Sequence, residues 1–201
     1  MALMSNTTHP QDPESTAERF SGIEWAMHER TLHSEKAFQG KLLRVNVLDV
    51  ELECGKRAIR EIVKHPGAAV ILAQRPDSQF VFVRQYRKAV EMELLEVVAG
   101  TIDPGETPDA CAHRELTEET GYTATSLKKL GEIYPAPGYS EEVLHVYFAE
   151  LSPDRGAMRP DDDERLEVEL LSSKTLEAMI KNGDIRDAKT LAAWTLYRSN
   201  Q

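Results

Sequence analysis

The chain has 201 residues, of which 41% are hydrophobic and 29% are charged, a composition typical of a soluble globular protein. Its 24 Lys and Arg residues against 34 Asp and Glu residues give a formal net charge of −10. This charge disfavours non-specific binding to nucleic acid or to anionic lipid. The longest apolar run, 68–73, is far shorter than the roughly 20 residues that a membrane-spanning helix requires.

Residues 1–20 are polar, include two prolines and show no periodicity, so we predict a flexible N-terminal tail. They lack the basic start and apolar centre of a signal peptide, which favours a cytoplasmic protein. Cys54 and Cys111 lie far apart, without a Cys/His cluster around them. This spacing argues against a disulfide framework and a zinc site, and indicates two packing residues.

Several runs with strand patterns follow the tail. Residues 42–53 and 58–63 alternate apolar with polar side chains around a turn at Gly55, which predicts a hairpin within an N-terminal strand extension, 21–66. Further strands are expected at 68–73, 79–84 and 94–99.

A helix of three to four turns is expected next, with Thr107 as N-cap, Pro108 in its first turn and Gly121 at its C-terminal end. Three more strands, one surface loop and two helices complete a single α+β domain, 67–201. The strands are expected at 127–134, 143–150 and 165–171, the loop at 152–164 and the helices at 174–181 and 187–198. The acidic run at 161–164 is interpreted as part of the solvated loop.

On the predicted helix, Glu115, Glu118 and Glu119 follow one another at i, i+3 and i+4 and therefore share one face. Like charges about 6 Å apart destabilise a helix unless a cation offsets them. Carboxylate clusters suit Mg²⁺ or Mn²⁺, whereas the alternative is a solvated acidic face. Arg114 and Glu106 can form an ion pair that ties the preceding loop to the helix.

The spacing of residues 100–122 resembles the signature of the Nudix hydrolases at every fixed position. The resemblance implies a Nudix fold, in which a mixed β-sheet lies between helices, and hydrolysis of a nucleoside diphosphate linked to another moiety. It implies that Glu115, Glu118 and Glu119, with the backbone carbonyl of Ala99, hold two or three Mg²⁺ or Mn²⁺ ions. Glu118 is also counted among the catalytic residues. Four residues have a structural role in the motif: Gly100, Glu106, Arg114 and Gly121.

Other segments are similar to the ADP-ribose pyrophosphatases within this family, including 60–68, 84–87, 137–142 and 187–190. Pro137 stands fifteen residues after Tyr122, where that subfamily has a proline. The resemblance implies hydrolysis of ADP-ribose to AMP and ribose 5-phosphate. Two alternatives are another nucleoside diphosphate sugar or a dinucleotide as substrate, and a non-catalytic sensor of ADP-ribose. The complete set of glutamates argues against the sensor.

The resemblance makes Glu142 the general base or a further metal ligand, with the adjacent Glu141 as the alternative. Arg87 is implied to contact the diphosphate or the ribose; otherwise it is a rim residue paired with Glu91 or Glu93. Glu96 is expected to face the site, unless it is only a charge at a strand edge.

Arg60 and Glu61 are implied to contact the adenosine end of the substrate from the partner subunit of a domain-swapped homodimer. The alternative is that both are strand residues facing solvent. Trp25, Phe38 and Tyr139 are candidates for stacking on the adenine. The expected partners are thus a small nucleoside diphosphate sugar and a second copy of the chain, with no nucleic acid and no membrane.

Overall fold

The structure is a computed structural model that describes residues 27–41, 43–159 and 165–201. The predicted tail at 1–20, Trp25 and the acidic run at 161–164 lie outside these residues. By their contacts the described residues form two units. One comprises 27–34 and Leu48–Arg60, and the other comprises Glu35–Val47 and the described part of Glu61–Gln201. The division predicted at residue 66 stays a prediction.

The N-terminal sheet has three strands in the order β1-β2-β3: β1 is Glu29–Gln39, β2 is Arg44–Leu52 and β3 is Arg57–Lys64. The predicted hairpin is confirmed as β2 and β3, and Gly55 in its turn has φ 78°. Strand β1 was not predicted, because all eleven of its residues are exposed and no apolar alternation marks it. Cys54 is exposed in the turn, so its prediction as a packing residue is wrong.

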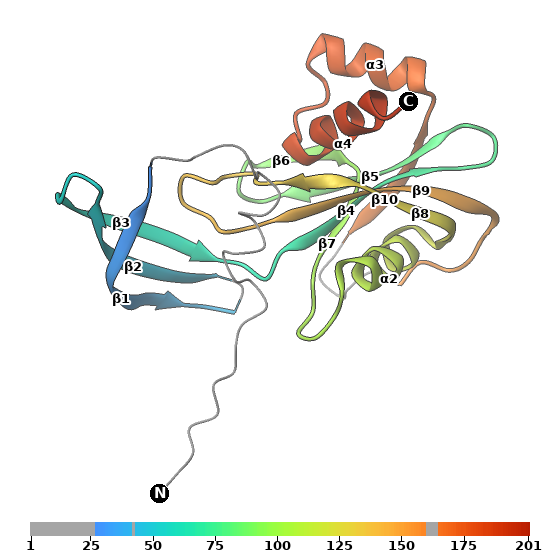
Figure 1. Ribbon diagram of the computed structural model, residues 1–201. Coiled ribbons are helices and arrows are strands. Elements are labelled where there is room, and N and C mark those ends of the chain that lie inside the picture. The colour runs from blue at the N-terminus through green and yellow to red at the C-terminus, as the bar shows by residue number, and fades with distance from the viewer. Residues whose placement is uncertain (1–26, 42, 160–164) are drawn as a thin grey trace, which may run out of the picture. The chain divides into compact units, whose positions relative to one another are not determined.

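The main sheet is mixed and has seven strands (Figure 1). Its order is β10-β5-β4-β9-β8, with β6 paired to β5 and β7 paired to β4. Strands β4 and β9 are parallel, and the other pairs are antiparallel. The strands are β4 Ala68–Gln74, β5 Phe80–Arg87, β6 Met92–Glu96, β7 Val98–Thr101, β8 Tyr122–Ile133, β9 Leu144–Arg155 and β10 Leu166–Leu171.

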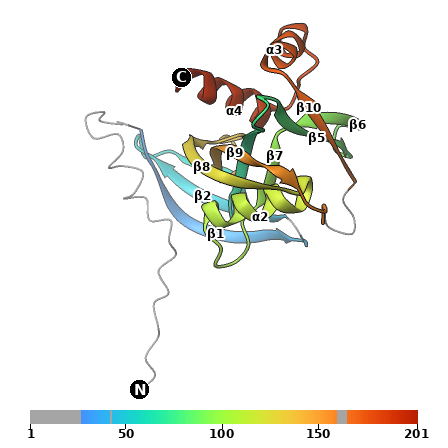
Figure 2. The same ribbon diagram turned by 90° about the vertical axis from the view of Figure 1, so that its right-hand side faces the viewer.

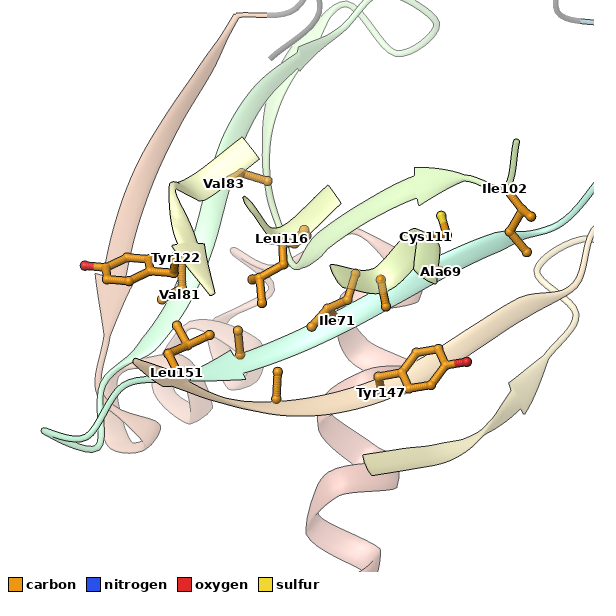
Figure 3. Close-up of a cluster of buried hydrophobic side chains, with 14 residues drawn as sticks. Ala69, Ile71, Val81, Val83, Ile102, Cys111, Leu116, Tyr122, Tyr147 and Leu151 are labelled. Atoms are coloured by element: carbon orange, nitrogen blue, oxygen red, sulfur yellow. The ribbon is translucent and has the colours of Figure 1, made fainter. Parts of the chain in front are cut away.

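Three helices cover the two faces of this sheet, as predicted: α2 is Pro108–Thr120, α3 is Ser173–Asn182 and α4 is Ala188–Ser199. In Figures 1 and 2, α2 lies on the opposite side of the sheet from α3 and α4. Strand β4 serves both faces because successive side chains point to opposite sides. Ala69 and Ile71 pack in the core with Leu116 of α2 (Figure 3), whereas Val70 and Leu72 pack in the core with Trp194 of α4.

Two predicted boundaries near the site are wrong. The strand expected at 94–99 is two strands, because the chain changes partner from β5 to β4 at Val97. The loop expected from Ser152 begins later, because β8 and β9 continue as a pair to Tyr122 and Arg155. The polar and proline-containing end of β9 is largely exposed, so its composition looks like that of a loop.

Candidate functional site

Helix α2 carries the predicted glutamates, and its ends are those that the sequence predicts. The Thr107 side chain accepts a hydrogen bond from the backbone N–H of Ala110, and Gly121 closes the helix in the left-handed conformation at φ 73°. A side chain at Gly121 would also collide with the chain that crosses the helix end, since its Cβ would lie 2.4 Å from the carbonyl oxygen of Gly156. The helix register is therefore fixed from both ends.

Arg114 and Glu106 form the predicted ion pair between the loop and the helix. Two guanidinium nitrogens of Arg114, Nε and Nη2, donate to the Glu106 carboxylate at 2.9 and 2.8 Å. The hydrogen bonds from Arg114 are the main cause that lowers the pKa of Glu106 to about 2, although burial acts to raise it. The Asp103 N–H and the charge of Arg114 lower the pKa further by smaller amounts. Glu106 is thus ionised throughout the physiological pH range and serves as an anchor for the loop.

Glu115 lies directly against the strand that precedes the loop. A Cβ atom at Gly100 would be only 1.9 Å from Cδ and Oε1 of Glu115, so the carboxylate occupies the space that any side chain at this position would take. Nη1 of Arg114 donates to Glu115 at 2.6 Å and to Glu118 at 3.2 Å. Gly100 is needed here for this close approach of the Glu115 carboxylate to strand β7.

Arg87 is held by Glu96 instead of the Glu91 or Glu93 of its alternative interpretation. Nε and Nη2 of Arg87 donate to the two Glu96 oxygens at 2.8 and 2.7 Å, and Lys189 of α4 also bonds to Glu96. The Glu96 side chain is only 1% exposed, which works to raise its pKa, but the hydrogen bonds and charges of Arg87 and Lys189 hold the pKa below its ordinary value. The hydrogen bonds that Arg87 donates to Glu96, and then the charges of Glu96, Asp187 and Glu119, raise the pKa of Arg87.

A pocket of about 330 Å³ joins these elements. Four predicted site residues line it, Arg87, Ala99, Gly100 and Glu142, together with the first turn of α4 at 187–189. Glu119 of α2 is buried, with 5% of it exposed. Its negative charge is close enough to contribute to the raised pKa of Arg87. The fold therefore brings residues from β5, β7, the start of α4 and the loop before β9 to one pocket, and no residue of α2 lines it.

Other predicted residues lie elsewhere. Arg60 is on β3, where it pairs with Glu29 of β1, and Glu61 next to it is exposed. Neither lines the 330 Å³ pocket. Glu118 lines a different cavity of about 720 Å³, together with Arg114 and with residues from the end of β9 onward. Phe38 and Tyr139 are 53% and 60% exposed, and their role toward adenine stays a prediction.

The donor set fits a divalent ion in its chemistry. Three carboxylates on one helix face and a strand carbonyl are oxygen ligands of the kind that Mg²⁺ and Mn²⁺ prefer. The missing side chain of Gly100 leaves the space that the Glu115 carboxylate occupies. Among the described residues, no group of three His, Cys, Asp or Glu side chains stands in an arrangement ready to hold an ion. Nη1 of Arg114 bonds to Oε1 of Glu115 and to Oε2 of Glu118, so the guanidinium would share these two carboxylates with an ion.

Asp187 and Lys189 have no role in the site predictions, although 187–190 belongs to the resemblance. Lys189 contacts Glu96 across 93 positions of sequence, and only the packing of α4 on the sheet brings the two together. A signal was nevertheless present, since an Asp N-cap and a Lys begin a helix that is otherwise largely apolar.

Comparison with known proteins agrees with this geometry. The model of the NUDIX domain matches residues 63–194. An ADP-ribose pyrophosphatase of Bacillus subtilis is 40% identical over 84% of this chain and 91% of its own length. A methanol dehydrogenase activator of Bacillus methanolicus is 39% identical over 82% and 90%. A GDP-mannose pyrophosphatase of Citrobacter koseri is 38% identical over 62% and 69%.

The solved structures include a similar fold. A chain described as an ADP compounds hydrolase superimposes with a TM-score of 0.74 at 25% sequence identity, and the match covers 85% of this chain and 92% of that one. No helix in the described ranges is both long and apolar enough to cross a membrane.

Proposed function

Since this chain belongs to the Nudix family, we propose that it hydrolyses the diphosphate of ADP-ribose to AMP and ribose 5-phosphate. The observation that carries this function is the placement of Arg87, Ala99, Gly100 and Glu142 around one pocket, with Glu115 packed on Gly100. The relative that is similar over 84% of the chain is an ADP-ribose pyrophosphatase. We place the enzyme in the cytoplasm as part of the same proposal.

Each side chain has a distinct task in this reaction. Arg87, fixed by Glu96, binds a diphosphate oxygen through the N–H groups that Glu96 leaves available. Glu142 accepts a proton from a water molecule, the water oxygen bonds to one phosphorus, and the bond from that phosphorus to the bridging oxygen breaks. Glu115, Glu118, Glu119 and the Ala99 carbonyl would hold two or three Mg²⁺ or Mn²⁺ ions, which neutralise phosphate charge and lower the pKa of bound water.

The substrate is tested with a panel of ADP-ribose, GDP-mannose and NADH in the presence of Mg²⁺. We expect the highest kcat/KM for ADP-ribose, with AMP and ribose 5-phosphate as products. A preference for GDP-mannose would favour the second candidate, which the GDP-mannose pyrophosphatase relatives support. Tight binding of ADP-ribose without turnover would instead identify a sensor.

The metal ligands are tested by Glu115→Gln and Glu119→Gln. Each variant should lose more than about 100-fold in kcat/KM, because loss of a direct ligand should exceed the 10- to 100-fold effects of outer groups. Glu177→Gln, at an exposed ion pair with Arg198, is the matched control and should keep its activity. Near wild-type turnover in either site variant, with an intact far-UV spectrum, would refute the ligand assignment.

We also propose that the protein is a homodimer in which Arg60 and Glu61 of one copy bind the substrate of the other. Two observations support this dimer. All residues of strand β1 are exposed, and apolar side chains such as Phe38 of β1 and Ile59 of β3 are exposed on the N-terminal strands. Sedimentation at micromolar concentration should give the mass of two chains. A monomer under these conditions would contradict the role of Arg60 and Glu61.

A further inference from the structure

The loop before β9, which carries Glu142, is attached to the end of strand β3. The backbone N–H of Val63 donates to the carbonyl of Tyr139 at 2.7 Å, and the N–H of Glu141 donates to the carbonyl of Val63 at 3.1 Å. Val63 of β3 and Ser140 of the loop thereby form an isolated parallel bridge. The loop thus has a fixed attachment on the residues just before Glu142.

The side chain of Glu141 strengthens this attachment. Its Oε2 pairs with the ammonium group of Lys64, and its Oε1 accepts the backbone N–H of His65 at 3.2 Å. Both carboxylate oxygens are therefore engaged by residues at the end of β3. Glu142, the next residue, lines the pocket with Arg87 and Gly100, and Glu141 does not.

Glu142 depends on its neighbours for its position. Its carboxylate makes a longer approach, 3.7 Å from Oε1 to Nδ1 of His65, and its side chain is 27% exposed. On its other side, the carbonyl of Val143 accepts the N–H of Ala68 at 3.0 Å, where β4 begins. A general base must come within about 3 Å of the water that it deprotonates, and a misplacement of about 1 Å can cost on the order of 100-fold in rate.

We propose that Lys64 and Glu141 are positioning residues, which form a clasp that holds Glu142 in place for water activation. The clasp consists of the Lys64–Glu141 ion pair and the bond from His65 N–H to Glu141. The proposal rests on the proposed hydrolase function and on Glu142 as the base. It also answers the choice between two adjacent glutamates, since one carboxylate is used in attachment and the other faces the pocket.

The clasp should affect rate more than stability. Lys64 and Glu141 are 42% and 33% exposed, and an ion pair this exposed to solvent contributes little to stability. Its removal should leave the protein folded, while the loop samples more positions. Because a mispositioned base slows the chemical step without removing contacts to the substrate, kcat should fall and KM should stay nearly constant.

The test compares Lys64→Met, Lys64→Arg and Glu141→Gln with Glu177→Gln as the matched control. We expect Lys64→Met and Glu141→Gln to lower kcat for ADP-ribose roughly 5- to 20-fold, with KM within about twofold of wild type. Lys64→Arg keeps the cation and should restore most of the rate. Amide hydrogen exchange at 139–143 should accelerate in Lys64→Met and in Glu141→Gln. It should remain unchanged in Lys64→Arg and in the control.

Two kinetic outcomes would overturn the clasp. If Glu141→Gln abolishes turnover while Lys64→Met keeps it, Glu141 is itself the base. If neither variant changes kcat or exchange, the contact does not position the loop. Hydrogen exchange also separates this proposal from the proposed function: a wild type that hydrolyses nothing in the panel refutes the function, whereas unchanged exchange in Lys64→Met refutes the clasp alone.

Discussion

Arg87 and Glu96 show how one buried residue prepares another for binding. A carboxylate at 1% exposure is costly unless it is fully paired, and Arg87 and Lys189 supply that pairing. In return Glu96 fixes the plane of the Arg87 guanidinium through two hydrogen bonds. Because Arg87 remains 41% exposed, a diphosphate can reach a group whose orientation is already set.

At the same scale, Glu106 predicts how stability depends on pH. The pKa of Glu106 is lowered from 4.5 to about 2 in the folded protein, so its ionised form stabilises the fold above pH 4.5. This contribution is lost as the pH falls from about 4.5 to about 2. We expect the wild type to lose roughly 1–2 kcal/mol more stability than Glu106→Gln across this range, after allowance for solvent screening.

Urea unfolding at a series of pH values measures this difference. Glu177→Gln removes an exposed carboxylate and should follow the wild-type curve. If the free energy of unfolding falls equally with pH in the wild type and in Glu106→Gln, the ion pair with Arg114 does not stabilise the folded state.

The helices and strands that can be predicted are those whose buried side chains or helix caps leave a recognisable pattern in the sequence. Strands β4 and β5 and helix α2 carry apolar residues, caps or a signature that the sequence displays, and their positions are confirmed. Strand β1 buries nothing among the described residues. At the break between β6 and β7, the N–H of Val97 donates to Thr190, 93 positions away. The signature locates Glu115 and Glu119 because it is a local sequence pattern. The pairing of Lys189 with Glu96 joins distant parts of the chain and follows only from tertiary packing.

Thr190 therefore offers a test of how α4 is attached to the sheet. Its buried Oγ1 accepts the Val97 N–H at 2.9 Å and donates to Oδ2 of Asp187 at 2.6 Å. Thr190→Val keeps the shape but leaves a buried N–H unsatisfied, which should cost about 1–3 kcal/mol. The unfolding temperature, followed by circular dichroism, should fall by roughly 3–8 °C.

Thr190→Ser retains the hydroxyl and serves as the control. We expect it to unfold close to the wild-type temperature, with only the small loss that follows from removing a methyl group. Equal unfolding temperatures for the two variants would mean that the Val97 hydrogen bond is not what holds α4.

For the whole molecule, the location of charge matters more than its sum. Residues 100–122 contain six acidic residues and one basic residue, so this segment contributes −5 of the net −10. The overall charge disfavours long polyanions. The same local excess is what the proposed divalent ions would neutralise when a small diphosphate binds.

Removal of divalent ions should accordingly stop hydrolysis without unfolding the protein. The apolar cores on both faces of the sheet and the ion pair of Arg114 with Glu106 are made by protein groups alone. An ion at ten times its Kd adds only about 1.4 kcal/mol to stability. We expect EDTA to abolish turnover and to lower the unfolding temperature by a few degrees, with full recovery on adding Mg²⁺. Unfolding by EDTA would contradict this expectation.

Arg114 has a consequence for how the enzyme would respond to its surroundings. Through Nη1 it already neutralises Glu115 and Glu118, while Nε and Nη2 hold Glu106. An ion held by Glu115 or Glu118 would then share these carboxylates with Arg114, which would keep its anchor in the loop through Glu106. Sharing with a cation would make ion binding weaker than capture by bare carboxylates. Occupancy would therefore follow the free Mg²⁺ concentration, and the rate of hydrolysis would report on that concentration.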